Sequence, residues 1–527
     1  MTTRLVEVNV IARNKKGELV TDLTRDEFIL RDKGHEEPIS HFSAISSGDS
    51  GRLLSHPLPP NTFSNRVARL AGATSVTAIL FDGLNTRVTD QTYAREQIVE
   101  FLRHLQPGDQ VAIYALGRGL NVLQDFTSDS GMLIRAIENY QGDLSAEATP
   151  AARDTLDPGV VQFRNWLSEL RLNLVDHYAR DRSLRTIRSL VAIANHVERL
   201  PGRKNLVWVS GSFPVWIGRE SVPLPARPTA GVQTFRPEVE RAARALDSAN
   251  LAIYPVDARG LMAPVAYEPH QAAYNPGSRS PEWSKMHTME QLAARTGGRA
   301  FFNNNDLVRA FHAASTDSRH AYILGFQPSH EQWNGKFRPI KVRVKRKGVR
   351  LQYRAGYFAQ PTQPSDQWYR SGVLDAAMWS PVEATRLGFT VRPAAVSNAG
   401  LDLEIQIDPH DLALLPSGDT RTGELEVRMV QIGRADRFLK SDAHIARLRL
   451  PTARYAQLMR SGSLPLLERI TRAPGAALLR VLVYDVNSGA LGSVNIPLEK
   501  LPASPIPAPP PAAGADRTTP SAAPPGL

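Results

Sequence analysis

The sequence has no cysteine among its 527 residues. This absence excludes disulfide bonds, thiolate catalysis, iron–sulfur clusters and cysteine-ligated zinc. It leaves the compartment open, because both reducing and oxidising environments hold proteins without cysteine. Long apolar runs are also missing. Stretches such as Val76–Phe81 and Leu478–Tyr484 are strand-sized and fall well short of the roughly 18 residues that cross a bilayer. We therefore expect no transmembrane segment.

The amino terminus lacks the features of a secretory signal peptide. Residues Met1–Glu7 contain neither a long apolar stretch nor a small-residue cleavage site. Two expectations follow for the location of the protein. Either it stays in the cytoplasm, or this chain begins after a removed or missed export signal.

Length and composition predict several globular domains. At about 150 residues per domain the chain is too long for one core, and its 42% hydrophobic and 22% charged residues are typical of globular proteins. Lysine and arginine exceed aspartate and glutamate by 63 to 52, a net charge of +11. Over so long a chain this is a mild bias toward anionic partners.

Hydrophobic patterning divides the chain into five parts. Strand patterns at both flanks of a central region are expected to pack together, because neither alone buries a core. Clean alternation, as in Leu401–Ile407, predicts an antiparallel β-sandwich that folds independently. The last 27 residues hold nine prolines and are expected to be disordered or polyproline-like. The expected parts are a β segment at 1–45, the central domain at 72–318, a second β segment at 319–360, the sandwich at 380–500 and the tail at 501–527.

The central region alternates short apolar runs with helical patterns. Such runs are typical of strands buried on both faces of a parallel sheet, and helices between them imply right-handed crossovers. The predicted fold class is therefore α/β, with a doubly wound, mostly parallel sheet. The four runs are Val76–Phe81, Val111–Leu116, Asn205–Val209 and Leu251–Val256.

The clearest candidate site follows the first of these runs, in the segment Phe81-Asp82-Gly83-Leu84-Asn85-Thr86. Open parallel sheets bind ligands beyond the carboxyl ends of their strands. An acid with short oxygen-bearing side chains can hold a hard cation there. Alternatively, Asp82 and Asn85 make turn and helix-cap hydrogen bonds at a strand–helix corner. The residue types alone leave both interpretations open.

This segment resembles the metal-ion-dependent adhesion site of von Willebrand factor A domains, Asp-x-Ser-x-Ser. Asp82 matches the acid, Leu84 stands at the first serine and Thr86 at the second. The family's second acidic motif would fall at Ser210-Gly211, where the acid is missing. The resemblance implies a degenerate site that binds Mg²⁺ or Mn²⁺ weakly. The residues that this hypothesis assigns to the metal are Asp82, Asn85, Thr86, Ser210 and Asp257, and candidates for the family's isolated threonine are Thr149 and Thr155.

Asp257 is included because it ends another buried strand. If the sheet keeps the von Willebrand order, the Asn205 strand lies between the other two, and Asp257 can partly replace the missing acid. The alternative is an ion pair between Asp257 and Arg259.

A wider set of motifs resembles the VWFA-related proteins abundant in Acidobacteria. The resemblance covers about residues 5–358 and implies a von Willebrand A-like fold, and many such proteins carry export signals. The motifs are Leu19–Phe28, Gly202–Val207, Ile253–Leu261, Leu292–Arg299, Tyr322–Phe326 and Arg354–Phe358.

A basic hairpin follows the central domain. Its cations suit an anionic polymer, a lipid headgroup or nucleic acid, but alternating basic residues also occur on solvated or protected strands. No specific nucleic-acid partner is expected. The basic residues are Lys341, Arg343, Lys345, Arg346, Lys347, Arg350 and Arg354.

Three functions remain in view. The first is a non-enzymatic, adhesion-type module that binds an unidentified protein; if a metal is present, the resemblance implies that its open position takes a carboxylate of the partner. The second is a metal-dependent hydrolase that uses Asp82 and Asp257, although the sequence shows no identifiable general base, nucleophile or complete set of metal ligands. The third is a metal-free scaffold.

Overall fold

The computed structural model describes most of the chain, and all structural statements below concern that part. The predicted helical stretch 162–200 is described from residue 181 onward, and Thr149 and Thr155 lie outside the described residues. Among the described residues, no helix is both long and apolar enough to cross a membrane. The described ranges are 5–45, 58–66, 75–141, 181–200, 203–211, 236–260, 281–304, 306–329, 333–359, 367–396, 400–501 and 517–518.

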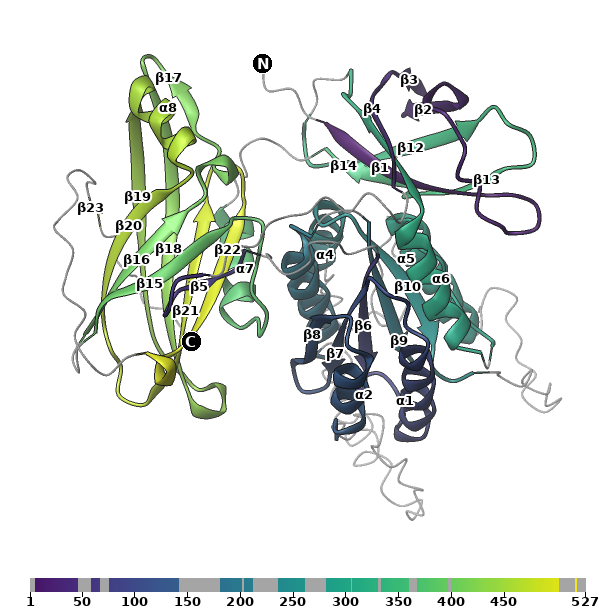
Figure 1. Cartoon of the computed structure of the whole chain (residues 1–527), viewed down its shortest axis with the longest axis horizontal. Helices are drawn as coiled ribbons and strands as arrows, with labels where there is room; N and C mark the ends of the chain where they lie inside the picture. Colours follow the sequence, from purple (N-terminus) through teal and green to yellow (C-terminus); the bar gives the residue numbers. More distant parts are fainter. Residues whose placement is uncertain are drawn as a thin grey trace, which may run out of the picture.

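Strands from both flanks of the central region form one β module, residues 5–45 and 321–359 (Figure 1). Two sheets, in the orders β13-β1-β11-β4 and β14-β12-β2-β3, each combine strands from the two segments. One apolar cluster, which includes Val8, Leu30, Leu324 and Val342, lies between them. The strands are β1 (Val6–Arg13), β2 (Phe28–Asp32), β3 (His35–Glu37), β4 (Ile39–Ile45), β11 (Ala321–Phe326), β12 (Phe337–Val344), β13 (Arg350–Gln352) and β14 (Gly356–Phe358).

The central domain, residues 75–319, contains a five-stranded sheet in the order β10-β9-β6-β7-β8. The first four strands are parallel, and β9 lies between β6 and β10 as expected. Edge strand β8 is antiparallel and was not predicted. The chain is thus a mixed α/β protein. The elements are β6 (Ser75–Asp82), α1 (Val88–Arg103), β7 (Asp109–Leu116), β8 (Leu120–Thr127), α2 (Ser130–Glu138), the helical segment 181–197, β9 (Lys204–Ser210), α4 (Arg236–Ser248), β10 (Leu251–Asp257), α5 (Pro281–Thr296) and α6 (Val308–Arg319).

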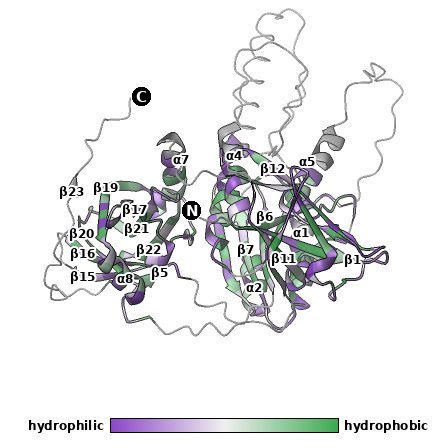
Figure 2. Ribbon diagram, turned by 90° about the horizontal axis from the view of Figure 1, so that it is seen from above, coloured by the Kyte–Doolittle hydropathy of each residue, from purple (hydrophilic) through white to green (hydrophobic). Residues whose placement is uncertain are grey.

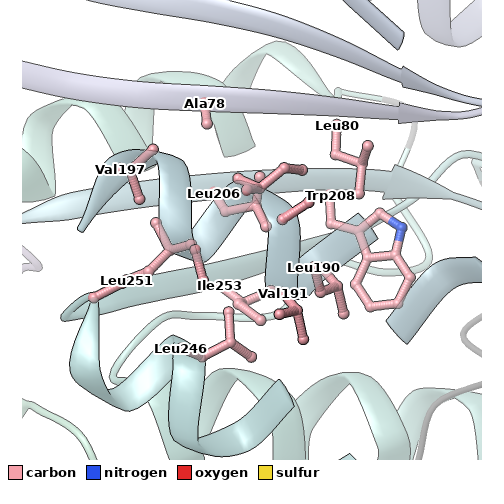
Figure 3. Packing of buried hydrophobic residues seen from close by; sticks show 14 of the residues in the cluster. Ala78, Leu80, Leu190, Val191, Val197, Leu206, Trp208, Leu246, Leu251 and Ile253 are labelled. Carbon is pink, nitrogen blue, oxygen red and sulfur yellow. The ribbon is translucent and has the colours of Figure 1, made fainter. Parts of the chain in front are cut away.

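Helices cover both faces of this sheet. Alternate residues of β6 point to opposite faces, so Ala78 and Leu80 belong to one core and Ile79 and Phe81 to another. Figure 3 shows the first core, where Leu190 of the segment 181–197 lies near Trp208 of β9. The second core packs against α1, α2 and α6. Burial on both faces explains why these strands are continuous apolar runs.

The C-terminal module, residues 63–64, 367–396, 400–501 and 517–518, contains two antiparallel sheets around a shared core. The sheets have the orders β20-β16-β15-β5 and β22-β21-β18-β19-β23, and Leu403 and Val481 are among the core residues that they contribute. Figures 1 and 2 show this module to one side of the other two. Its elements are β5 (Phe63–Ser64), α7 (Gln367–Met378), β15 (Phe389–Val396), β16 (Gly400–Ile407), β17 (Leu415–Ser417), β18 (Thr420–Gly433), β19 (Phe438–Pro451), α8 (Thr452–Ser461), β20 (Leu464–Thr471), β21 (Ala476–Asp485), β22 (Leu491–Pro497) and β23 (Arg517–Thr518).

Two strands of this module come from segments predicted to have no structure. β5 lies between the expected β segment at 1–45 and the expected central domain at 72–318, and it pairs with Thr390 and Val391 of β15. β23 lies in the proline-rich tail and pairs with Ile445 and Ala446 of β19; the rest of the tail beyond residue 501 is outside the described residues. A fragment limited to 380–500 lacks both strands.

Asn65, the residue after β5, anchors the segment around β5 to the rest of the C-terminal module. Its amide nitrogen donates to the carbonyls of Ala384 at 2.7 Å and Leu387 at 2.8 Å, and its oxygen accepts from the Phe389 amide at 2.9 Å. All four residues are buried. The segment that contains β5 and Asn65 is therefore an integral part of this module.

We predict that Asn65→Ala destabilises the C-terminal module by about 2–4 kcal/mol, because buried groups left without partners cost about 1–3 kcal/mol each. Hydrogen exchange of the Phe389 amide in the full chain should accelerate accordingly. Ser64→Ala is the matched control, since Ser64 is only half-buried, and its hydroxyl donates to the Phe389 carbonyl at 3.1 Å and accepts from the Arg66 amide at 3.0 Å. Equal exchange in Asn65→Ala and wild type would contradict the prediction.

The carboxyl end of the helical segment 181–197 packs against the C-terminal module. The Thr385 hydroxyl donates to the carbonyls of Asn195 at 3.1 Å and His196 at 2.9 Å, which satisfies acceptors that a helix end leaves open. An Arg199–Asp411 ion pair of 2.5 Å lies beside this contact. The two modules are thus joined by polar groups.

Glu383 makes this contact sensitive to pH. Burial raises the pKa of Glu383 from 4.5 to about 7, although the Asn495 amide and nearby His196 and Arg480 lower it and Asp125 raises it. The pKa of His196 is also raised: burial lowers it, but the hydrogen bond and charge of Asp125 raise it more. Both groups bind protons more tightly in the folded chain, so their contribution to stability is complete below about pH 4.5 and is lost as the pH rises through about 7.

We therefore predict that Glu383→Gln reduces the fall in melting temperature between about pH 5 and pH 8. Glutamine mimics the protonated acid and can still accept from the Asn495 amide, which lies 2.7 Å from Glu383 Oε1. Glu499→Gln, at an exposed position, should follow the wild-type profile. Parallel profiles for Glu383→Gln and wild type would show that Glu383 does not titrate in this range.

Candidate functional site at the carboxyl edge of the central sheet

Asp82 ends β6 and is buried, with 1% of its surface exposed. The Asn85 side-chain amide donates to both carboxylate oxygens, at 3.1 and 2.9 Å, and the Asn85 backbone amide donates at 3.0 Å. From β9, Trp208 Nε1 donates at 3.0 Å and the Ser210 hydroxyl at 2.8 Å. The carboxylate is therefore held entirely by uncharged donors from its own loop and the neighbouring strand.

The loop after Asp82 is fastened to the surrounding elements. Gln91 of α1 donates to the carbonyls of Gly83 at 3.1 Å and Thr86 at 2.8 Å. The Thr86 hydroxyl accepts from the Gly211 amide at 2.9 Å, and the Asn85 amide also donates to Thr186 of the segment 181–197 at 3.0 Å. Residues 81–86 are all buried. The loop is thus a rigid joint between β6, α1 and β9.

Burial raises the pKa of Asp82, while the hydrogen bonds from Asn85, Trp208 and Ser210 lower it. Removing a carboxylate from water disfavours its charged form. The donors offset only part of that cost, so the group is less acidic than an exposed aspartate.

Asp257 lies at the same edge but has a different partner. It aligns with Ser210 on the neighbouring strand, and its carboxylate accepts from Arg259 Nε at 2.9 Å and Nη2 at 2.7 Å. The Arg259 backbone amide adds a third bond of 3.0 Å. Register therefore brings Asp257 to the edge, and its carboxylate forms the ion pair with Arg259 that the sequence left as an alternative.

These residues as arranged do not fit a divalent ion. The Asp82 carboxylate already accepts N–H and O–H donors from Asn85, Trp208 and Ser210, and the Thr86 hydroxyl accepts from the Gly211 amide. The buried acceptor of this loop without a hydrogen-bond partner is Asn85 Oδ1, and one neutral oxygen does not offset the dehydration of Mg²⁺. Within the described ranges, no group of three or more His, Cys, Asp or Glu could hold a metal.

Three residues of this site were missed by the sequence reasoning: Trp208, Thr186 and Gln91. Trp208 carried a signal, because it lies two positions before Ser210 in β9 and so points to the same face. A buried indole N–H usually needs an acceptor, and Asp82 supplies it. Thr186 and Gln91 lie on helices, where nothing in the local pattern separates them from ordinary core positions.

Comparisons with known proteins give only distant likenesses. No protein-family model and no curated protein matches the chain. An aerotolerance-related membrane protein from Bacteroides fragilis is 13% identical, over 46% of this chain and 98% of its own, with a TM-score of 0.26. A von Willebrand factor type A protein from Catenulispora acidiphila is 8% identical, over 90% and 72%, with a TM-score of 0.24. The N-terminal domains of the pilus tip protein Mfa5 from Porphyromonas gingivalis are 8% identical, over 88% and 77%, with a TM-score of 0.25.

TM-scores of this size carry no argument about fold or function. Both rest instead on the strand order and the contacts of the chain itself.

The burial of Asp82 changes what its removal should do. A charged residue at a strand end is seldom part of the core, but Asp82 is buried, with 1% of its surface exposed. We predict that Asp82→Ala lowers the free energy of unfolding by about 3–5 kcal/mol, because it leaves buried donors of Trp208 and Asn85 without an acceptor. Thermal unfolding of the full chain measures the loss.

The same measurement tests the metal. Millimolar Mg²⁺ or Mn²⁺ should leave the melting temperature of the wild type unchanged relative to EDTA, because an ion that binds only the folded chain raises it. A clear rise with the ion, absent in Asp82→Ala, would restore the adhesion-site hypothesis.

Proposed function

We propose that the chain is a non-enzymatic, protein-binding module whose von Willebrand A-like central domain works without a metal ion. The observation that carries this proposal is the complete pairing of Asp82 with uncharged donors. The position at which such a sheet binds ligands holds a structural joint. The loop after Asp82 therefore presents a surface of fixed shape to a partner.

The exposed part of this surface is the turn that follows the buried loop. Residues 81–86 are buried, whereas Arg87, Val88 and Thr89 at the start of α1 are exposed. Val88 has 50% of its surface exposed, which makes it one of the few large apolar side chains in this state. Because the loop beneath is fixed by Gln91 and Gly211, a partner that contacts this turn need not order it, and preorganisation of this kind favours binding.

The hydrolase alternative receives less support. A catalytic acid or base needs a lone pair or a proton directed at the substrate. Asp82 and Asp257, its two proposed carboxylates, are each bonded to three or more donors of the protein. The metal-free scaffold shares the closed Asp82 site and differs only in assigning all partner contacts to the β-rich modules.

Affinity isolation from the source cells tests the proposal. We predict that wild-type chain retains a specific protein equally in EDTA and in Mg²⁺, and that Val88→Asp loses it. Val122→Asp is the matched control, because Val122 is also exposed, at 38%, but lies on edge strand β8. Release of the protein by EDTA would contradict the metal-free site, and retention by Val88→Asp would favour the scaffold.

A further inference from the structure

The basic hairpin forms a line of exposed cations at the tip of the β module. Lys341 and Arg343 are exposed on the outward face of β12, and Lys345 follows its last residue, while Val342 and the preceding Ile340 are buried in the core. Positions two apart on a strand are separated by about 6.6–6.8 Å. The side chains therefore form a regular row on one face.

The row continues into the neighbouring turns. Lys347 and Gly348 of the turn after β12, together with Lys15 and Lys16 of the turn after β1, line one open hollow, to which Asn14 and the carboxylate of Glu18 also contribute. Gly348 lies beside Lys15, since a Cβ added to the glycine would be in van der Waals contact with Lys15 Cε, at 3.5 Å. Figure 1 shows both turns at the end of the β module away from the C-terminal module.

These cations are not neutralised by the protein. Among described residues, none of Lys15, Lys16, Lys341, Arg343, Lys345 and Lys347 makes an ion pair, whereas the nearby Arg346 is paired with Glu27 at 2.8 Å and with Asp22 at 2.7 Å. The sheet register also places Lys341 directly opposite Arg31 of β2. Like charges at directly opposite positions destabilise a sheet, and although Arg31 is paired with Glu36 of β3 at 3.4 Å, Lys341 has no such partner among the described residues.

We propose that this basic row binds an acidic segment of a protein, in extended conformation, with carboxylates at alternate positions. An extended peptide repeats its side chains on one face with the same spacing of about 6.6–6.8 Å as the row, so each carboxylate meets one cation. Charge complementarity of this kind gives specificity and a fast association rate.

Nucleic acid fits the row less well. Single strands bind through bases stacked on aromatic side chains as well as through phosphates. The outward residues beside the row on β2 are Ile29 and Arg31, and neither offers a ring. The surface also differs from the turn at Val88, since it belongs to another module, so the inference goes beyond the function proposed above.

Fluorescence anisotropy of the full chain with labelled peptides tests the proposal. The probe is a peptide with alternating glutamate and threonine, and a peptide of equal composition with its glutamates in one block tests the spacing. We expect the alternating peptide to bind more tightly than the block peptide and to weaken as salt shortens the screening length, which is about 10 Å at 0.1 M. Equal affinity for the two peptides would overturn the match of spacing.

The decisive variant is the triple change Lys341→Glu, Arg343→Glu and Lys345→Glu, which should weaken binding of the alternating peptide at least about tenfold. The control Arg454→Glu, Arg460→Glu and Arg472→Glu makes the same change of net charge at exposed positions of the C-terminal module and should bind as wild type. Val88→Asp should also bind as wild type, which separates this surface from the other.

Stability supplies an independent readout. Because the change Lys341→Glu places a carboxylate opposite Arg31, the triple variant should melt no lower than wild type, so loss of binding cannot be ascribed to unfolding. Equal binding by the two triple variants overturns the proposal. Tighter binding of a single-stranded oligonucleotide or of anionic lipid vesicles, lost in the first triple variant, would overturn it in favour of that class of partner.

Discussion

The pairing of β1 with strands from the far side of the central domain constrains the whole chain. Val6 to Val10 align with Phe326 to Tyr322, and the following residues align with β13. β1 is buried over nearly its full length, so it cannot reach its final environment until residues beyond 320 are in place. The central domain is consequently inserted between two strands of one sheet, and its two ends are held together.

Buried polar groups join that β module to the amino edge of the central sheet. Tyr254 of β10 donates to Asp317 at 2.6 Å, and Asp317 also pairs with Arg13 of β1. Gln352 of β13 donates to the Gly297 carbonyl at 3.0 Å. Buried polar contacts add little net stability, but a buried polar group that loses its partner destabilises the fold. They therefore fix the relative position of the two modules at the amino edge of the sheet.

The sequence predicted what short-range patterns determine. Parallel strands buried on both faces are continuous apolar runs, and all four were recognised. β8 was missed because it is an edge strand whose residues are mostly exposed, and β5 because its two residues lie in a segment rich in proline and glycine. Asp82 was located, but its burial was not foreseen, because Trp208 and Thr186 lie 126 and 101 residues from their partners at the site. Only the folded sheet brings them together.

Two groups of charged residues in this chain show how pairing separates structure from recognition. At Asp82 the donors of Asn85, Trp208 and Ser210 are bonded to the carboxylate. The charged group therefore stabilises a loop, and removal of the side chain should lower the free energy of unfolding. In the row of Lys341, Arg343 and Lys345 the cations are exposed, and Lys341 faces Arg31, which is paired with Glu36, so ion pairs within the fold do not account for the row. A charged side chain that is exposed and makes no ion pair within the fold is available to a partner. By this criterion the conspicuous acid of the central domain is a structural residue, and the surface cations of the β module are the better candidates for binding.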